Sequence, residues 1–322
     1  MKVKFGVHIE PQLGYDYENT LNIALEAEKL GYESFWVSDH LFLNDKSENQ
    51  NCMDAWTLLA ALAADTTKIR LGTLVTCNSY RHPALLAKIA ATIDMISKGR
   101  LWFGYGAGWK KDEYDAYGYP FPKIHHRMDM MEEALQIMKL LWTEPHPSFK
   151  GKHYSIKNAF SAPKPVQKPH PPILIGGDGE KRTLRMVAEY ADYCNLFLRE
   201  NLEHKLDVLK EHCKTVGRDY NDVGKSLFAQ GWPGVFVTDS EEELETHLTW
   251  RVANLGASRE EVLENARSNA PGSWVGYPEE VIERFEHFIG LGFDFFQVMF
   301  PGIGNDNIEA SRNFAKLVMK KL

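Results

Sequence analysis

The 322-residue chain has few cysteines and no long apolar run. The four cysteines are Cys52, Cys77, Cys194 and Cys213. They form no CxxC pair, so the sequence indicates neither a disulfide framework nor a zinc knuckle. No stretch is apolar enough to cross a bilayer, and His8 and Glu10 interrupt the apolar N-terminus, which disfavours a signal peptide. We therefore expect a cytoplasmic protein with reduced thiols and no membrane partner.

The sequence also lacks any block of basic residues. The formal net charge is −7, which argues against nucleic acid and anionic membranes as partners. Neither a GxxxxGK[ST] loop nor a GxGxxG turn with a ribose-binding acid downstream occurs, so P-loop and Rossmann nucleotide sites are excluded. Hydrophobic residues make up 44% of the chain, enough for a large core without metals. A small-molecule ligand is the remaining expectation.

Short β-branched and aromatic runs alternate with segments of helical period along the whole chain. Strands are expected at residues 4–9, 34–37, 69–73, 101–106, 173–175 and 194–198, between 225 and 237, and at 295–300. Helices are expected at residues 17–30, 55–64, 83–96, 127–142, from near 181, and at 201–216 and 307–322. This alternation predicts an α/β fold, a (β/α)8 TIM barrel formed as one domain by residues 1–322. An excursion near 143–172, rich in proline and lysine, and a helical insertion near 240–277 interrupt it.

In such a barrel the active site is built from the loops that follow the strands. Candidate residues at these positions are His8 and Glu10, Asp39 and His40, Leu74 to Cys77, Gly106 to Trp109, and Gly176 to Gly179. We expect them to converge on one cavity. The Asp39–His40 pair suits acid or base catalysis, because histidine titrates near neutral pH. A hydrogen-bonded structural histidine is an equally good interpretation, since neighbouring side chains of an extended strand point in opposite directions.

Two glycine-rich segments are candidate ligand-binding segments. Gly176, Gly177 and Gly179 precede a helix, where free backbone N–H groups and the helix N-terminus can bind a phosphate. Asp178 in the same loop would repel a phosphate if it pointed inward. The segment GAGW at residues 106–109 lets the backbone approach a planar ligand beside the Trp109 indole. A barrel corner with a packing tryptophan is the alternative.

Several longer segments together resemble a known family. They are GYESFWVSDH at residues 31–40, IRLGTLVT at 69–76, YRHPALLAKIAATID at 80–94, GRLWFGYGAGW at 99–109, AYGYPFP at 116–122 and PPILIGGDGEKRTLRMVAEYADYCN at 171–195. These segments resemble the luciferase-like monooxygenase superfamily, and within it the oxidoreductases that use the deazaflavin coenzyme F420; the resemblance runs nearly end to end.

The resemblance implies a bacterial-luciferase-like barrel with the coenzyme ring at the carboxyl ends of the strands. His40, with Asp39, would lie at the redox-active edge of the ring and manage protons during hydride transfer to or from a small organic substrate. A non-prolyl cis peptide between Leu74 and Val75 would support one ring face. The implied coenzyme-binding residues are Asp39, His40, Leu74, Val75, Thr76, Cys77, Gly106, Ala107, Gly108, Gly176, Gly177, Asp178, Gly179 and Asn195. Substrate would touch His8, Glu10, His40 and Trp109.

Two residues depart from the family pattern, and three alternative functions remain open. Cys77 stands where relatives commonly carry glycine, and Asp178 where they often have glycine or serine.

The first alternative function is an FMN-dependent monooxygenase or reductase on the same fold. The second is a metal-dependent hydrolase with His8, Glu10, Asp39 and His40 as ligands, and the third a coenzyme-binding protein without activity. A homodimer is expected from the resemblance. Loops 41–53, 110–124 and 258–276 carry no recognisable substrate code.

Overall fold

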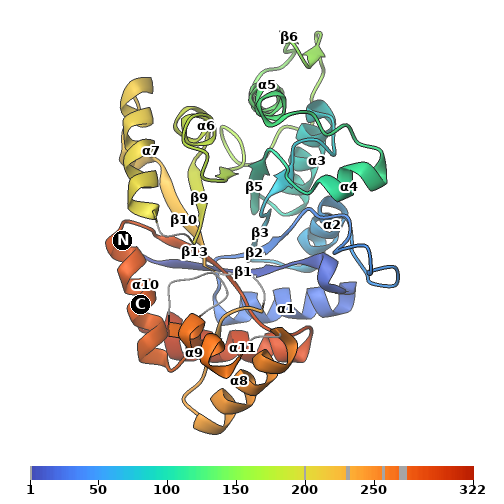
Figure 1. The fold of residues 1–322 in the computed structure, drawn as a ribbon. Helices are drawn as coiled ribbons and strands as arrows, with labels where there is room; N and C mark the ends of the chain where they lie inside the picture. The colour runs from blue at the N-terminus through green and yellow to red at the C-terminus, as the bar shows by residue number, and fades with distance from the viewer. Residues whose placement is uncertain (1, 199–200, 230–232, 256–257, 268–273) are drawn as a thin grey trace.

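Eight parallel strands close into a barrel in the computed structural model, which describes residues 2–198, 201–229, 233–255, 258–267 and 274–322 (Figure 1). The strands are β1 (Lys4–Ile9), β2 (Ser34–Val37), β3 (Arg70–Thr73), β5 (Leu101–Gly106), β8 (Ile173–Gly176), β9 (Tyr193–Phe197), β10 (Gly224–Phe228) and β13 (Phe295–Met299). β1 pairs with β2 and β13, and β3 pairs with β5, so the sheet returns on itself. The predicted TIM barrel is confirmed.

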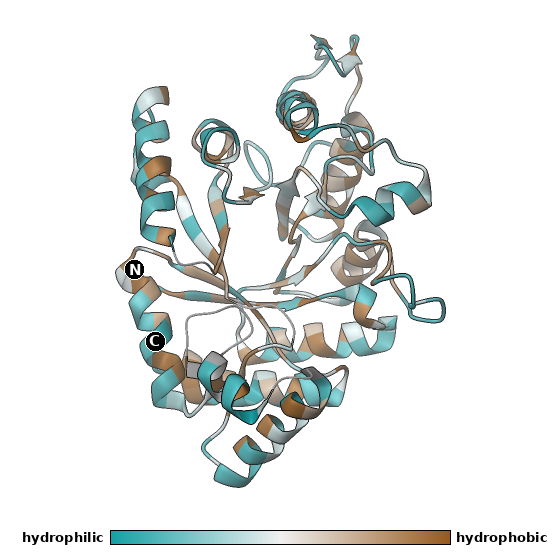
Figure 2. Cartoon of the chain, viewed as in Figure 1, coloured by the Kyte–Doolittle hydropathy of each residue, from teal (hydrophilic) through white to brown (hydrophobic). Residues whose placement is uncertain are grey.

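Helices surround the barrel, as Figure 1 shows. They are α1 (Tyr17–Leu30), α2 (Ala55–Asp65), α3 (Pro83–Ile96), α5 (Ile124–Thr143), α6 (Thr183–Tyr190), α7 (Leu202–Val216), α10 (Pro278–Gly290) and α11 (Asn305–Phe314), the last followed by a π-helical turn at Ala315–Met319. The ends of α1 illustrate the local signals: the Asp16 side chain accepts a hydrogen bond from the Asn19 N–H, and Gly31 ends the helix with φ 85°. Figure 2 shows apolar residues concentrated on the strands and on the helix faces that meet them. None of the helices described is long and apolar enough to cross a membrane.

Large aromatic side chains fill the amino-terminal half of the barrel interior. Trp36, Trp102 and Phe295 lie within 6.0 Å of one another, measured between ring centroids. Gly72 makes room for this layer, because a Cβ there would meet the Trp36 indole at 2.6 Å. Above it Asn195 donates hydrogen bonds to Ser226 and to the side-chain oxygen of Gln297. Because side chains fill the amino-terminal half of the barrel, a ligand can enter only at the carboxyl ends of the strands.

The structure also contains elements that the sequence pattern did not predict. They are α4 (Lys111–Tyr117), a hairpin of β6 (Phe149–Lys150) and β7 (Ser155–Ile156) within the excursion, short 3-10 turns at Pro11–Leu13 and Tyr220–Asp222, and α10. The helix α4 spans only two turns, too few for a periodic pattern to stand out. The start of α10 does carry ordinary signals, Pro278 in the first turn and a Glu280 carboxylate that accepts from the Tyr277 N–H at 3.0 Å.

The insertion after β10 is a small unit with its own strand pair. β11 (Phe236–Val237) pairs with β12 (Val275–Gly276), and α8 (Glu241–Leu255) and α9 (Arg259–Arg267) lie between them in the chain. The helical character expected for residues 240–269 is therefore found in two helices. Residues 256–257 and 268–273 of the insertion lie outside the described residues. The second of these segments is also part of the expected substrate loop 258–276.

Candidate active site

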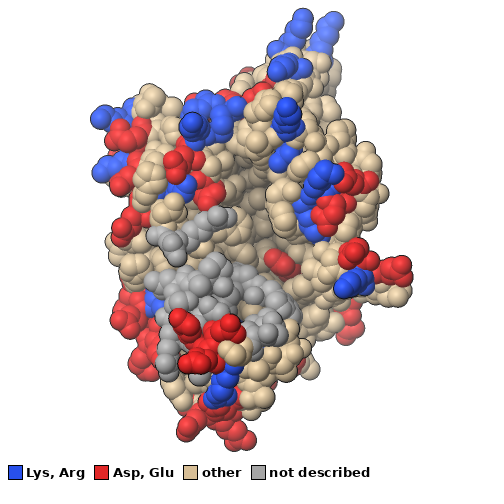
Figure 3. Space-filling view, in the orientation of Figure 1, with Lys and Arg blue, Asp and Glu red and all other residues tan. Residues whose placement is uncertain are grey.

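A cavity of about 600 Å³ opens at the carboxyl ends of the barrel strands. Figure 3 shows the surface hollowed near the middle of this face, between the segments that carry α6 and α4. All seventeen residues predicted for the site line it: His8, Glu10, Asp39, His40, Leu74, Val75, Thr76, Cys77, Gly106, Ala107, Gly108, Trp109, Gly176, Gly177, Asp178, Gly179 and Asn195. The expected convergence on one cavity is thus observed, and the role of each residue stays a prediction.

Nine further residues line the cavity that sequence reasoning did not single out. They are Ser38, Tyr80, Lys110, Glu113, Ile124, Met128, Thr183, Phe197 and Phe228. Phe197 and Phe228 end strands β9 and β10, so the strand-end rule would have found them. The signal for Glu113 is an acidic first turn in a short segment that stops at Gly118, which indicates a helix. Nothing in that pattern distinguishes a buried catalytic acid from a surface one.

The carboxylate that contacts His40 belongs to Glu113. His40 Nδ1 lies 3.0 and 3.1 Å from the two Glu113 oxygens, and the Glu113 side chain is 1% exposed. The backbone N–H of Leu41 and the hydroxyl of Tyr80 also donate to this carboxylate, at 2.8 and 2.6 Å. Nε2 of His40 has no hydrogen-bond partner in the described parts of the chain, and the side chain is 18% exposed at the cavity. The arrangement presents one imidazole nitrogen to a ligand and holds the other on a carboxylate.

The hydrogen bonds around Glu113 keep it ionised. Burial alone would raise its pKa, but the contacts with His40, Tyr80 and the Leu41 N–H outweigh burial and lower the pKa to about 2. Glu113 also lies in the first turn of α4, where the helix dipole favours a negative charge. An ionised carboxylate on Nδ1 orients the imidazole and stabilises a positive charge on it.

Asp39 lies beside His40 in sequence but makes different contacts. Its Oδ2 accepts hydrogen bonds from the Cys77 N–H at 2.9 Å and from the Arg81 guanidinium at 2.7 Å. Burial raises the pKa of Asp39, and the Arg81 charge and the Cys77 N–H oppose that rise. Arg81 also pairs with Asp54, the N-cap of α2. Asp39 and His40 thus contact different partners, and Asp39 supports the backbone of the neighbouring strand. The catalytic role expected for the two residues stays a prediction.

That neighbouring strand contains a break at the cavity floor. The peptide bond between Leu74 and Val75 is cis, as the resemblance implied, and separates β3 from β4 (Thr76–Cys77), both of which pair with β5. The side chain of Val75 fits against two glycines: a Cβ on Gly106 would meet Val75 Cγ2 at 2.7 Å, and one on Gly176 would meet Cγ1 at 3.0 Å. These glycines therefore accommodate the break, whether or not they also contact a ligand.

The loop after β8 offers free backbone donors. The Gly177 N–H donates to the Asn195 carbonyl at 3.1 Å, and Gly177 has φ 122°, which favours glycine. The N–H groups of Gly179, Glu180 and Lys181 meet no acceptor within the described ranges, and α6 begins two residues later. A backbone of this form at a helix N-terminus fits a phosphate.

Cys77 is a buried free thiol. Its sulfur lies 3.1 Å from the Tyr114 hydroxyl, and burial raises its pKa to about 11, so it stays protonated at neutral pH. A Cβ on Gly108 would meet the same hydroxyl at 2.1 Å, which explains glycine there. These contacts give Cys77 a packing role.

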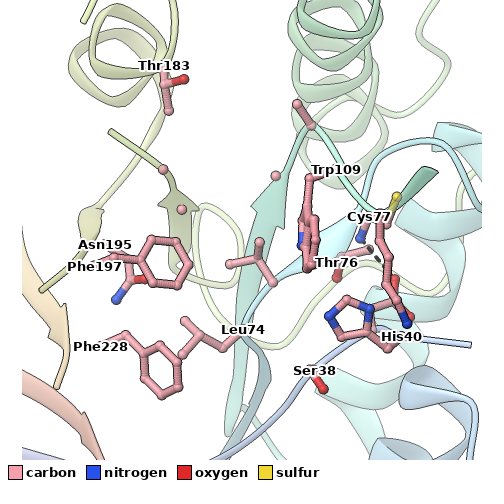
Figure 4. Close-up of a pocket in the computed structure, with 18 of the residues that line it drawn as sticks. Ser38, His40, Leu74, Thr76, Cys77, Trp109, Thr183, Asn195, Phe197 and Phe228 are labelled. Atoms are coloured by element: carbon pink, nitrogen blue, oxygen red, sulfur yellow. Dashed lines mark hydrogen bonds between the residues drawn. The ribbon is translucent and has the colours of Figure 1, made fainter. Parts of the chain in front are cut away.

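Aromatic rings form two sides of the cavity, with Leu74 between them (Figure 4). On one side the Phe228 ring lies 5.9 Å from Phe197 and 4.8 Å from His8, in edge-to-face contacts. On the other side Trp109, 72% exposed, packs edge-on to His40 at 5.7 Å. Burial lowers the pKa of His8 to about 3, so its ring is neutral. The slot suits a flat or apolar ligand body.

The residues proposed as metal ligands do not form a ligand set. Asp39 is engaged by Arg81 and Cys77, and His40 by Glu113. No group of three or more potential ligands suited to a metal ion occurs in the described part of the chain. The geometry of these four residues gives the hydrolase alternative no support.

Comparisons with known proteins agree with the fold. The family model of luciferase-like monooxygenases matches residues 2–294. An F420-dependent glucose-6-phosphate dehydrogenase of Amycolatopsis mediterranei is 26% identical over 321 residues, which cover 93% of this chain and 92% of the relative. The FMNH(2)-dependent dimethylsulfone monooxygenase of Pseudomonas putida is 26% identical over 316 residues, 89% of this chain and 84% of the relative. The structure of an F420-dependent secondary alcohol dehydrogenase with an F420-acetone adduct aligns with a TM-score of 0.79 at 23% identity, covering 99% of this chain and 98% of that one.

The closed barrel with a cavity at the carboxyl ends of its strands is the architecture of TIM-barrel enzymes. The chain belongs to the luciferase-like monooxygenase family. It is an oxidoreductase of this family with a flavin-type coenzyme, and the relatives named here use either F420 or FMN.

Proposed function

We propose that this protein exchanges a hydride between coenzyme F420 and a neutral alcohol or carbonyl compound. The observation that carries the proposal is the His40–Glu113 pair, which presents Nε2 to the cavity. Oxidising an alcohol to a carbonyl removes a hydride from carbon and a proton from oxygen. An imidazole backed by an ionised carboxylate is well suited to take that proton and, in the reverse direction, to return it.

The residues of the cavity fit an F420-type coenzyme. When bound, a deazaflavin accepts or gives up a hydride at a ring carbon and reacts little with oxygen. The N–H groups of Gly179, Glu180 and Lys181, which meet no acceptor among the described residues, would hold its phosphate. The break at Leu74–Val75, supported by Asp39 through the Cys77 N–H, would carry one face of the ring. The full-length similarity to an F420-dependent dehydrogenase supports this choice of coenzyme.

The aromatic side of the cavity would hold the substrate. Phe228 and Phe197 offer apolar contact to a substrate body, and the neutral His8 ring continues that surface into the barrel. Glu10 lies at the same end, and burial raises the pKa of its carboxyl. A carboxyl group at this position, ionised or not, offers no positive charge to an anionic substrate. These residues would exclude water and direct the substrate hydroxyl towards His40.

Coenzyme titration followed by turnover tests the proposal. The purified protein is titrated with F420 and with FMN and followed by absorbance, because the two bound coenzymes have different spectra. The loaded enzyme is then assayed with a panel of alcohols and ketones.

Replacing His40 with alanine should reduce turnover by about 10²-fold or more and leave the F420 dissociation constant nearly unchanged. His287→Ala, on the exposed side of α10, is the matched control. Equal turnover in His40→Ala would reject the role of His40, and F420 binding without any turnover would favour a coenzyme-binding protein.

The second candidate is an FMN-dependent monooxygenase or reductase. The similarity to the dimethylsulfone monooxygenase, which extends over 89% of this chain, favours it. In the same titration this function predicts tight FMN binding and substrate-dependent consumption of oxygen. A protein that binds FMN and fails to bind F420 would replace the first proposal with the second.

A further inference from the structure

Lys110 shares the carboxylate that contacts His40. The residue lies between β5 and α4, and its ammonium is 3.2 Å from Glu113 Oε1. Nζ also donates to the carbonyl oxygens of Phe42 and Leu43, the latter at 2.7 Å, and lies 4.7 Å from the centre of the Phe42 ring. The side chain is 11% exposed. Three oxygen atoms thus hold the charge in place.

The charge of Lys110 acts on His40 through this shared oxygen. Oε1 of Glu113 lies 3.0 Å from His40 Nδ1 and 3.2 Å from Lys110 Nζ, so the two nitrogens are at most about 6 Å apart, close enough for direct repulsion between two positive charges. A carboxylate in contact with an imidazole favours its protonated form, and an ammonium at the same oxygen opposes that preference.

We propose that Lys110 is a positioning residue of the proton-transfer pair: by sharing the Glu113 carboxylate, it sets the pH above which His40 can accept a proton. Without this charge the carboxylate acts on His40 alone, the imidazolium becomes more stable, and the neutral base appears only at higher pH. Only the turnover readout of this inference rests on the proposed function, because the protonation of His40 can be followed without coenzyme.

The other groups around His40 are common to every variant compared. They include His8 in β1, which is neutral, and Glu10 directly after β1. Asp39 follows β2 and is paired with Arg81. The Cys52 thiol donates to the His40 carbonyl oxygen at 3.2 Å, and burial raises its pKa to about 12. The Tyr80 hydroxyl contacts the far oxygen of Glu113. A change on replacing Lys110 therefore reports the loss of its charge.

Lys110→Gln is the sharpest variant, because glutamine keeps a donor for the loop carbonyls and removes the charge. Lys110→Met removes both, and Lys110→Arg keeps both. Lys111→Met is the matched control: Lys111 begins the same helix, is 63% exposed and pairs with Asp115. Two quantities are measured on the full-length protein. The first is the pH at which the ring C–H resonance of His40 changes in the coenzyme-free protein, and the second is the acidic limb of the kcat/KM profile of the loaded enzyme.

In Lys110→Gln and Lys110→Met we expect both quantities to move to higher pH by about one unit. Lys110→Arg should restore the original values, and Lys111→Met should shift them by less than about 0.3 unit, as for an exposed charge. An unchanged His40 resonance in both Lys110→Gln and Lys110→Met overturns the inference, and Lys110→Gln alone decides if Lys110→Met does not fold. A shifted resonance in a protein that turns over no substrate upholds the inference and counts against the proposed function.

Discussion

Replacing Glu113 with glutamine tests the electrostatic account of the site. The pKa of Glu113 falls from a usual value of 4.5 to about 2 in the folded chain. Because the folded-state pKa is the lower one, the stabilisation is fully present above pH 4.5 and is lost as the pH falls towards 2. A difference of about 2.5 pH units corresponds to about 3 kcal/mol at pH 7 and about 2 kcal/mol at pH 3.5. Glu113→Gln should lower the free energy of unfolding at pH 7 by about 3 kcal/mol.

The assay is urea-induced unfolding of both proteins, followed by tryptophan fluorescence at pH 7 and pH 3.5. The gap in unfolding free energy between wild type and Glu113→Gln should narrow by about 1 kcal/mol at the lower pH. Glu28→Gln serves as a control, because backbone N–H groups of residues 67–69 lower the pKa of Glu28 to about 2 far from the cavity. That variant should keep normal turnover, whereas Glu113→Gln should not. A gap for Glu113→Gln that is the same at both pH values would refute the reasoning.

Substitutions of His8, Phe228 and Gly106 test the burial and the packing of the cavity wall. Burial lowers the pKa of His8 from 6.5 to about 3, so the folded state with its neutral imidazole loses stability as the pH falls below 6.5. In His8→Phe, the decrease in unfolding free energy between pH 7 and pH 5 should be smaller by about 2 kcal/mol. Phe228→Ala should raise KM for an apolar alcohol about tenfold in steady-state kinetics and leave F420 affinity unchanged. Gly106→Ala should cost about 1–3 kcal/mol in urea unfolding because its Cβ meets Val75, and a second substitution, Val75→Ala, should recover most of that cost.

Much of the barrel could be predicted from local sequence patterns. The first strand and helix, Lys4–Ile9 and Tyr17–Leu30, match the structure residue for residue, because alternation, the cap at Asp16 and Gly31 are short-range signals. The prediction was weaker after residue 143. There the hairpin β6–β7 and the strand β11 consist of two-residue strands, whose pairing depends on distant segments. Short strands leave no periodic pattern to detect.

The candidate site, too, could be predicted only in part. The predicted lining residues other than His8 and Asn195 lie at or after the carboxyl ends of strands, and a parallel barrel brings all these ends to one rim whatever the loops do. The contacts within the site depend on the loops. Glu113 reaches His40 across 73 positions, from a helix of seven residues that follows a loop without a periodic pattern. The sequence alone contains no signal for that distance.

The sequence by itself determined the order of the barrel strands, and therefore which strand-end residues surround the cavity. Only the tertiary structure decided the partner of each side chain. Asp39 and His40 are neighbours in the chain, yet Asp39 binds Arg81 and the Cys77 N–H while His40 binds Glu113. The physical reason is that successive side chains of an extended backbone point in opposite directions. Each then takes its partner from whichever distant segment packs against its own side.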